Sequence, residues 1–209
     1  MIIDRYIPTL LLFSILCLSC KSDYEKEVDN SKKITARLKM ERLPSYDSLY
    51  NQIASREKNL ASLGLLVDTL YQTTKEITNL LDSLTVVVEK SDPTGERRDI
   101  GKSLLTTSPS GLRLTKGANS IYQYCLEIIK YGNREKILKE LFAKYRGYLS
   151  SGEFNLVYFS QSSSSFILMT LTGLKNDLIK ATYLALYDNN EITTKTVRPH
   201  NIMRIEESP

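Results

Sequence analysis

Tryptophan is absent from this sequence, and histidine and cysteine are scarce. Its 209 residues include no tryptophan, one histidine and three cysteines. A transition-metal site would lack its usual histidine or cysteine partners, because His200 stands alone in a terminal segment. The net charge of +4 is too small to indicate a nucleic-acid partner, and no basic cluster is interleaved with aromatic residues as in an RNA-binding motif. We therefore expect no metal, no cofactor and no nucleic acid.

The longest apolar run is also too short to cross a membrane. Arg5 precedes a mainly apolar segment, residues 7–18, whereas a transmembrane helix needs about 20 such residues. This length is typical of a secretory signal peptide, with an uncleaved signal anchor as the alternative. The run ends at Cys17-Leu18-Ser19-Cys20, which resembles the lipobox of bacterial lipoproteins, although Cys17 replaces the usual leucine. The resemblance implies cleavage before Cys20, acylation of its thiol and attachment to a membrane through lipid.

Removal of Cys17 and acylation of Cys20 would leave one free thiol, that of Cys125. An internal disulfide is then excluded, although an exported protein could form one. Cys125 lies among isoleucines and a tyrosine, so we expect a small buried core residue with no reactive role.

We divide the chain into a signal peptide (1–19), a tether (20–43), a helical bundle (44–190) and a C-terminal tail (191–209). The tether is rich in charge, and we expect it to become helical only near Ile34 and Leu38. In the bundle, apolar residues recur every seven positions in two interleaved series between Tyr46 and Val88. Only Arg56 and Thr74 interrupt them. The spacing predicts one long helix with a continuous, coiled-coil-like seam along which other helices pack.

The pattern changes after residue 95. Two β-prone runs, residues 104–107 and 112–115, flank Ser108-Pro109-Ser110-Gly111, which predicts a β-hairpin. Helical patterns follow between residues 117 and 132, between 133 and 150, and at about 166–187; residues 155–159 suit a strand or a packed loop, and 192–197 a short strand. The predicted fold class is mainly α: a bundle with one long heptad-patterned helix, three shorter helices and a small β-hairpin insertion.

No motif in the chain assembles a catalytic site. The stretch GERRDIGKS, from Gly95, looks like a phosphate-binding loop, but five residues instead of four precede Gly101 and the segment before it belongs to the long helix. Ser55 and Lys58 match a Ser-x-x-Lys pattern in mid-helix, without the partner motifs of penicillin-recognising enzymes. The four serines at 162–165 are more typical of a helix N-cap than of a nucleophile. We expect that the protein is not an enzyme.

Basic residues are unevenly distributed. From residue 97 to residue 146 there are eleven lysines and arginines against four acidic residues. Solvated helix faces account for such an excess, and a patch for an anionic partner is the alternative. Within GERRDIGKS, we consider Arg97, Arg98 and Lys102 candidates for contact with a protein or an anionic surface.

The helix predicted at about 166–187 resembles the end of the N-terminal periplasmic domain of GldM/PorM, a Bacteroidota family of gliding motility and type IX secretion. The resemblance is carried by Asn176-Asp177, by the leucine and lysine before them, and by the aromatic segment Val157-Tyr158-Phe159, and it extends over roughly residues 45–190. Ile179 and Thr182 stand where the family more often has polar residues, and a lipoprotein signal stands where it has a transmembrane helix. The resemblance implies a helical envelope domain used for protein contacts. Asn176 and Asp177 would then either fix the last helix by hydrogen bonds or bind a partner.

These observations predict a lipid-anchored envelope protein that acts as a non-enzymatic scaffold or interaction module, with a link to a gliding or type IX secretion apparatus. Its expected partners are envelope proteins, including further copies of itself, on the periplasmic side of the outer membrane. The alternative is a cell-surface lipoprotein that binds a small ligand or host component. Asp23, Glu25 and Glu27 favour that alternative, because they resemble acidic surface-export signals.

Overall fold

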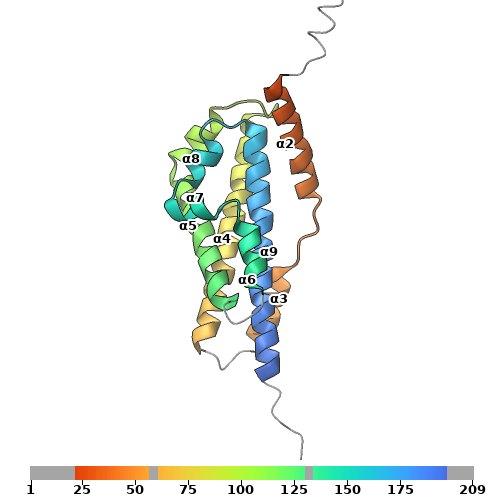
Figure 1. The fold of residues 1–209 in the computed structure, drawn as a ribbon, viewed down its shortest axis with the longest axis vertical. Coiled ribbons are helices and arrows are strands. Elements are labelled where there is room, and N and C mark those ends of the chain that lie inside the picture. The colour runs from red at the N-terminus through yellow and green to blue at the C-terminus, as the bar shows by residue number, and fades with distance from the viewer. Residues whose placement is uncertain (1–21, 57–60, 130–133, 197–209) are drawn as a thin grey trace, which may run out of the picture.

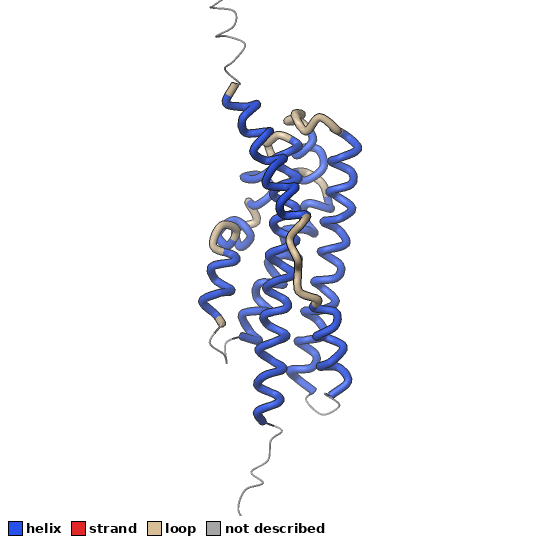
Figure 2. The backbone as a smooth tube through the Cα atoms, turned by 90° about the vertical axis from the view of Figure 1, so that its right-hand side faces the viewer, coloured by secondary structure: helices blue, strands red, loops and turns tan. Residues whose placement is uncertain are grey.

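The computed structural model describes residues 22–56, 61–129 and 134–196, which form an elongated bundle of helices (Figure 1). No strand occurs in these ranges (Figure 2). The elements are α2 (Asp23–Lys39), α3 (Tyr46–Arg56), α4 (Ala61–Ser91), the π-helix η2 (Lys102–Thr106), α5 (Pro109–Ile129), α6 (Glu135–Phe142), α7 (Arg146–Ser151), α8 (Phe154–Phe159) and α9 (Ser164–Thr196). The mainly α class is confirmed, and the β-hairpin insertion is wrong.

The last helix, α9, is the axis of the bundle. It packs against α2, α3, α4, α5, α6 and α8. Its apolar stripe is completely buried, at Ile167, Leu171, Leu174, Leu178, Ala181 and Ala185. Thr182 and Leu186, which lie outside that stripe, are buried as well. A helix enclosed on several sides cannot keep its apolar residues on one face only, so α9 has the composition of a central helix.

The single long helix predicted from Tyr46 to Val88 is wrong. The ring of Tyr71 lies 5.9 Å from that of Tyr46 and stacks on that of Tyr50 at 3.8 Å, measured between ring centroids. Along one helix, Tyr50 and Tyr71 would be about 32 Å apart. The chain therefore reverses between α3 and α4, and residues 57–60 lie outside the described ranges.

The heptad seam itself is confirmed on both helices of this hairpin. Every seam residue whose side chain is described is buried: Tyr46, Leu49 and Ile53 on α3, and Val67, Leu70, Thr74, Ile77, Leu81, Leu84 and Val88 on α4. Thr74, an apparent interruption, shares a buried hydrogen bond of 2.8 Å with Thr182 of α9. Polar pairing thus replaces apolar contact at that position.

The segment predicted as a β-hairpin forms η2 and the start of α5. Pro109 is the first residue of α5, where its missing N–H is not needed. Leu114, Ala118 and Ile121 then follow at helical spacing and are fully buried. Gly111 lies against the backbone of η2, because a Cβ there would overlap the carbonyl oxygen of Leu105. The Pro/Gly pair therefore marks a tight helix–helix corner.

Three smaller predictions also need correction. The helix expected between 133 and 150 is divided into α6 and α7, and residues 155–159 belong to α8. The short strand expected at 192–197 is helical up to Thr196, where α9 ends. The predicted stop after residue 150 is confirmed, because Gly152 ends α7 with a left-handed φ of 79°.

The predicted tether contains a docked helix. Ser22 caps α2: its hydroxyl accepts a hydrogen bond from the Glu25 N–H at 3.2 Å, and its own N–H donates to the Glu25 carboxylate at 2.9 Å. The helix therefore begins well before Ile34, and it lies along α9 (Figure 1). Its buried residues are Val28, Ser31 and Thr35, so this contact is thin and largely polar.

Candidate functional site

The GERRDIGKS segment closes one end of the bundle, where α2 begins, α4 ends and α9 begins (Figure 1). Its organising group is Asp92, which is only 4% exposed. The Asp92 carboxylate accepts hydrogen bonds from the Thr94 N–H at 3.1 Å, the Thr94 hydroxyl at 2.5 Å and the Arg97 N–H at 2.7 Å. Gly95 supplies the left-handed turn between them, with a φ of 78°. One buried carboxylate thus folds the loop around itself.

The same loop also binds the first turn of α9. The Ser164 hydroxyl donates to Asp92 at 2.8 Å, and the N–H groups of Ser164 and Ser165 donate to the carbonyls of Arg97 at 2.9 Å and Gly95 at 3.0 Å. These are the helix N-terminal groups to which phosphate binds in nucleotide-binding proteins. Here the carbonyl groups of the protein's own loop accept the hydrogen bonds of these N–H groups. The predicted N-cap role of the serine run is confirmed, because the Ser163 hydroxyl accepts from the N–H of Phe166 at 3.2 Å.

The charge state of Asp92 follows from these contacts. Burial by itself raises the pKa of the carboxyl group. Hydrogen bonds from Thr94, the Arg97 backbone, Ser164 and the Gly95 backbone outweigh that effect and hold the pKa of Asp92 well below its ordinary range. Asp92 is therefore a buried anion, held by donors in place of a cation.

The three predicted basic contact residues have different environments. The Arg97 guanidinium pairs with Asp99 at 2.6 Å and donates to the carbonyl of Ser91 at 3.3 Å. The Arg98 guanidinium lies 3.9 Å from the ring centroid of Tyr24 on α2, a cation–π contact. Lys102 is exposed at the start of η2, with no ion pair among the described residues. Two of the three cations therefore help to close the loop and to hold α2.

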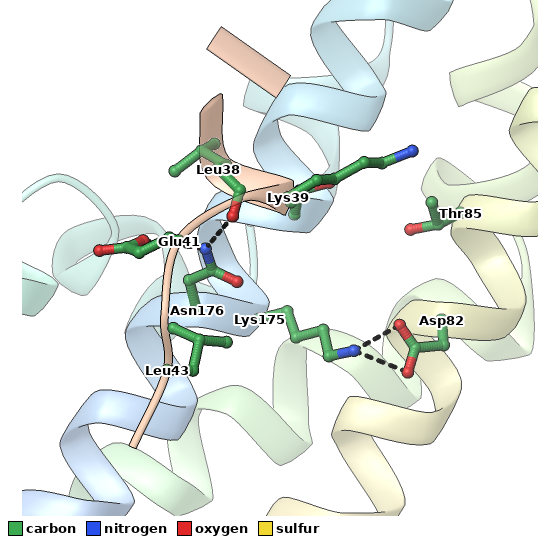
Figure 3. A pocket seen from close by; sticks show the side chains of 9 residues that line it. Leu38, Lys39, Glu41, Leu43, Asp82, Thr85, Lys175 and Asn176 are labelled. Atoms are coloured by element: carbon green, nitrogen blue, oxygen red, sulfur yellow. Dashed lines mark hydrogen bonds and ion pairs between the residues drawn. The ribbon is translucent and has the colours of Figure 1, made fainter. Parts of the chain in front are cut away.

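Asn176 fixes the end of α2 to α9. Its side-chain N–H groups donate to the carbonyl of Leu38 at 2.9 Å and to the Glu41 carboxylate at 3.0 Å (Figure 3). The ammonium of Lys180 also pairs with Glu41 at 2.6 Å. The hydrogen bond from Lys180 is the main cause that lowers the pKa of Glu41 below its ordinary value. Burial opposes it, and the hydrogen bond from Asn176 adds to the lowering.

Asp177 faces a different neighbour. Its carboxylate accepts from the Tyr145 hydroxyl at 3.2 Å and pairs with the Lys144 ammonium at 2.9 Å, at the corner between α6 and α7. Burial, and then the charge of Asp177, raise the pKa of Tyr145. These contacts agree with the structural alternative, in which Asn176 and Asp177 fix the last helix by hydrogen bonds. They lie about 18 Å along α9 from Ser164, so they and the predicted basic residues do not form one site.

We expect Asn176→Ala to lower the free energy of unfolding by about 2 kcal/mol, because it removes one neutral and one charge-assisted hydrogen bond. The loss should be local. Amide hydrogen exchange should accelerate in α2, whereas the amides of α5 keep their protection. Asn79→Ala is a matched control, because Asn79 is exposed on α4. Unchanged exchange in α2 would contradict the docking role of Asn176.

A small pocket lies beside Asn176, and no pattern in the sequence indicates it. It measures about 200 Å³ and lies between the end of α2, α4 and α9. Asp82 and Lys175 meet at its edge, with the ammonium 2.6 and 2.7 Å from the two carboxylate oxygens (Figure 3). Thr85 and Thr172 also line it. Asp82 and Thr85 belong to α4, whereas Thr172 and Lys175 belong to α9, far along the chain, which is why spacing alone could not indicate them.

The remaining chemical groups are built into the core. Cys125 is fully buried, which raises the pKa of its thiol. Among the residues described, no group of three or more His, Cys, Asp or Glu side chains could hold a metal ion. No helix in the same ranges combines the length and apolar character needed to span a membrane. His200, Lys58 and the predicted lipidation site Cys20 lie outside the described residues.

In comparisons with known proteins, the chain matches no protein-family model, no curated protein and no solved structure.

Proposed function

We propose that this protein is a lipid-anchored, non-enzymatic scaffold or interaction module of the bacterial envelope, on the periplasmic side of the outer membrane. The observation that carries the proposal is the position of α2. Its cap, Ser22, follows Cys20 by two residues, a reach of at most about 7 Å, and the helix is docked along α9. An acyl chain on Cys20 would therefore hold one end of the bundle close to the bilayer.

The use of polar groups within the fold supports the non-enzymatic part of the proposal. Asp92, Asn176 and Asp177 all make hydrogen bonds that join separate segments. The serines at the start of α9 bind the loop before η2, and the one described cysteine is enclosed in the core. Such a chain offers an elongated helical surface for contacts with other proteins. The link to GldM/PorM and type IX secretion remains a prediction from the residues around Asn176-Asp177.

We expect the full chain, expressed in a lipoprotein-processing bacterium, to incorporate an alkyne-tagged palmitate at Cys20. Cys20→Ser should abolish the labelling and leave the unprocessed precursor. Cys125→Ala is the matched control, because it removes the other mature cysteine and should label like the wild type. Labelled Cys20→Ser protein would refute the anchor.

Two further measurements test the location and the partners. Protease added to intact cells should leave the periplasmic protein uncut, whereas cleavage would favour the cell-surface alternative. Crosslinking in the native envelope should join the chain to specific proteins, with gliding or type IX secretion components among them if the family link holds. A chain that stays monomeric and without partners would contradict the scaffold role.

A further inference from the structure

The pocket beside Asn176 lies under the linker between α2 and α3, which runs over the outside of the bundle (Figure 2). We propose that it binds a compact zwitterion of the α-amino-acid class. The proposal goes beyond the scaffold role and is independent of lipidation at Cys20. It rests on hydrogen-bonding groups that face the pocket unused and on one charge of each sign at its edge.

Asn176 presents a fixed acceptor. The residue is 3% exposed, and its amide nitrogen donates to Leu38 and Glu41. Those two partners can only accept, so the nitrogen must face them. The amide oxygen then points into the pocket (Figure 3), where it accepts no hydrogen bond from the described residues. A ligand ammonium or N–H group would satisfy it.

Two threonine hydroxyls are available in the same place. A threonine within a helix commonly donates to the carbonyl four residues earlier, as Thr69 and Thr78 of α4 do at 2.7 and 2.9 Å. Thr85, which faces the pocket from α4 (Figure 3), and Thr172 of α9 make no such bond. Thr172 is only 8% exposed, so little water reaches the residue. Both hydroxyls can donate or accept.

The charges at the edge determine the ligand class. Asp82 and Lys175 pair with each other, and their side chains remain 57% and 28% exposed. The ammonium of a zwitterionic ligand would lie between Asp82 and the Asn176 oxygen, and the carboxylate of the same ligand would face Lys175. Such a ligand brings one charge of each sign into the pocket and no net charge. A ligand with only one charge would be attracted by one member of the pair and repelled by the other.

The size of the pocket limits the ligand to a small amino acid. A volume of about 200 Å³ corresponds to about seven waters at 30 Å³ each. Glycine, alanine and serine have about that number of non-hydrogen atoms or fewer. The side chains of Leu38 and Leu43 provide an apolar wall against which a methyl group could pack. L-alanine is therefore the probe of choice.

The test is a titration of the isotope-labelled full chain, followed by amide chemical shifts. L-alanine should saturate with a Kd of about 1 mM or below, shifting the amides of Thr85 and Asn176, while acetate and methylammonium bind at least tenfold more weakly. Thr85→Val and Thr172→Val, which keep the side-chain shape, should each weaken alanine binding several-fold. Thr69→Val is the control on α4 and should bind like the wild type.

Three results would overturn the proposal. The first is no saturation by about 10 mM alanine, since a Kd of 1 mM would then give about 90% occupancy. The second is a set of amide chemical-shift changes that alanine causes only away from the pocket. This result can be read from the wild-type protein alone. The third is an affinity for acetate or for methylammonium that equals the affinity for alanine.

Discussion

Replacing Gly111 by alanine is expected to lower the free energy of unfolding by about 3 kcal/mol, at the upper end of the usual cost of overpacking. The new Cβ would overlap the carbonyl oxygen of Leu105 and lie 2.9 Å from the side-chain nitrogen of Asn155. The first obstacle is backbone and cannot rotate away, so η2 and α5 must move apart. Urea denaturation followed by circular dichroism measures the change.

Gly147→Ala is the matched control. Gly147 lies in α7, and a Cβ there would meet no atom within 4 Å. Alanine should therefore leave the stability unchanged or raise it by up to about 1 kcal/mol, because glycine is the poorer helix former. Equal effects of the two substitutions would show that η2 and α5 do not meet at Gly111 in solution.

Replacing Asp92 by alanine is expected to cost about 3 kcal/mol as well. The substitution removes the acceptor for the Thr94 hydroxyl, the Arg97 N–H and the Ser164 hydroxyl, and leaves these donors without their partner. Asp99→Ala, in the same loop, should cost far less than Asp92→Ala, because its ion pair with Arg97 is exposed and screened by solvent. A similar loss for both variants would contradict the central role of Asp92.

The same carboxylate predicts a dependence of stability on pH. The pKa of Asp92 lies below the ordinary value of about 3.9 in the folded protein. Its stabilisation is therefore fully present above pH 4 and is lost as the pH falls below that value toward the folded pKa. Between pH 5 and pH 3, the wild type should lose more unfolding free energy than Asp92→Asn. Parallel losses would show that other carboxyl groups dominate.

The core could be predicted from the sequence, but the path of the chain could not. Seam residues such as Leu49 and Leu70 are buried in the structure as their spacing indicates. A heptad pattern reports which side of a helix is covered, and an antiparallel hairpin with the same inner face has the same pattern as one unbroken helix. The reversal between α3 and α4 depends on the contact of Tyr50 with Tyr71 and Asp68, which spacing does not reveal.

Short sequence patterns were ambiguous where the same residue types suit two different local structures. Pro109 and Gly111 suit a β-turn, and they equally suit the first turn of a helix that packs closely on another backbone. For the loop, Asp92 and Thr94 form a recognisable aspartate turn. Its contact with Ser164, 72 residues later, could come only from the fold. Asn176 drew attention through a resemblance, whereas its partners Leu38 and Glu41 did not.

The central position of α9 has a consequence for biosynthesis. Ribosomes make α9 after α2, α3, α4, α5, α6 and α8, all of which pack against it. Until residues 164–187 have been made, the earlier helices lack their central partner, although α4 and α5 can already pack on each other. We therefore expect the nascent chain to stay incompletely folded, and a chain truncated at residue 163 to be degraded in the cell. Folding that is completed only when α9 has been made would suit the export across a membrane that the proposed lipid anchor requires.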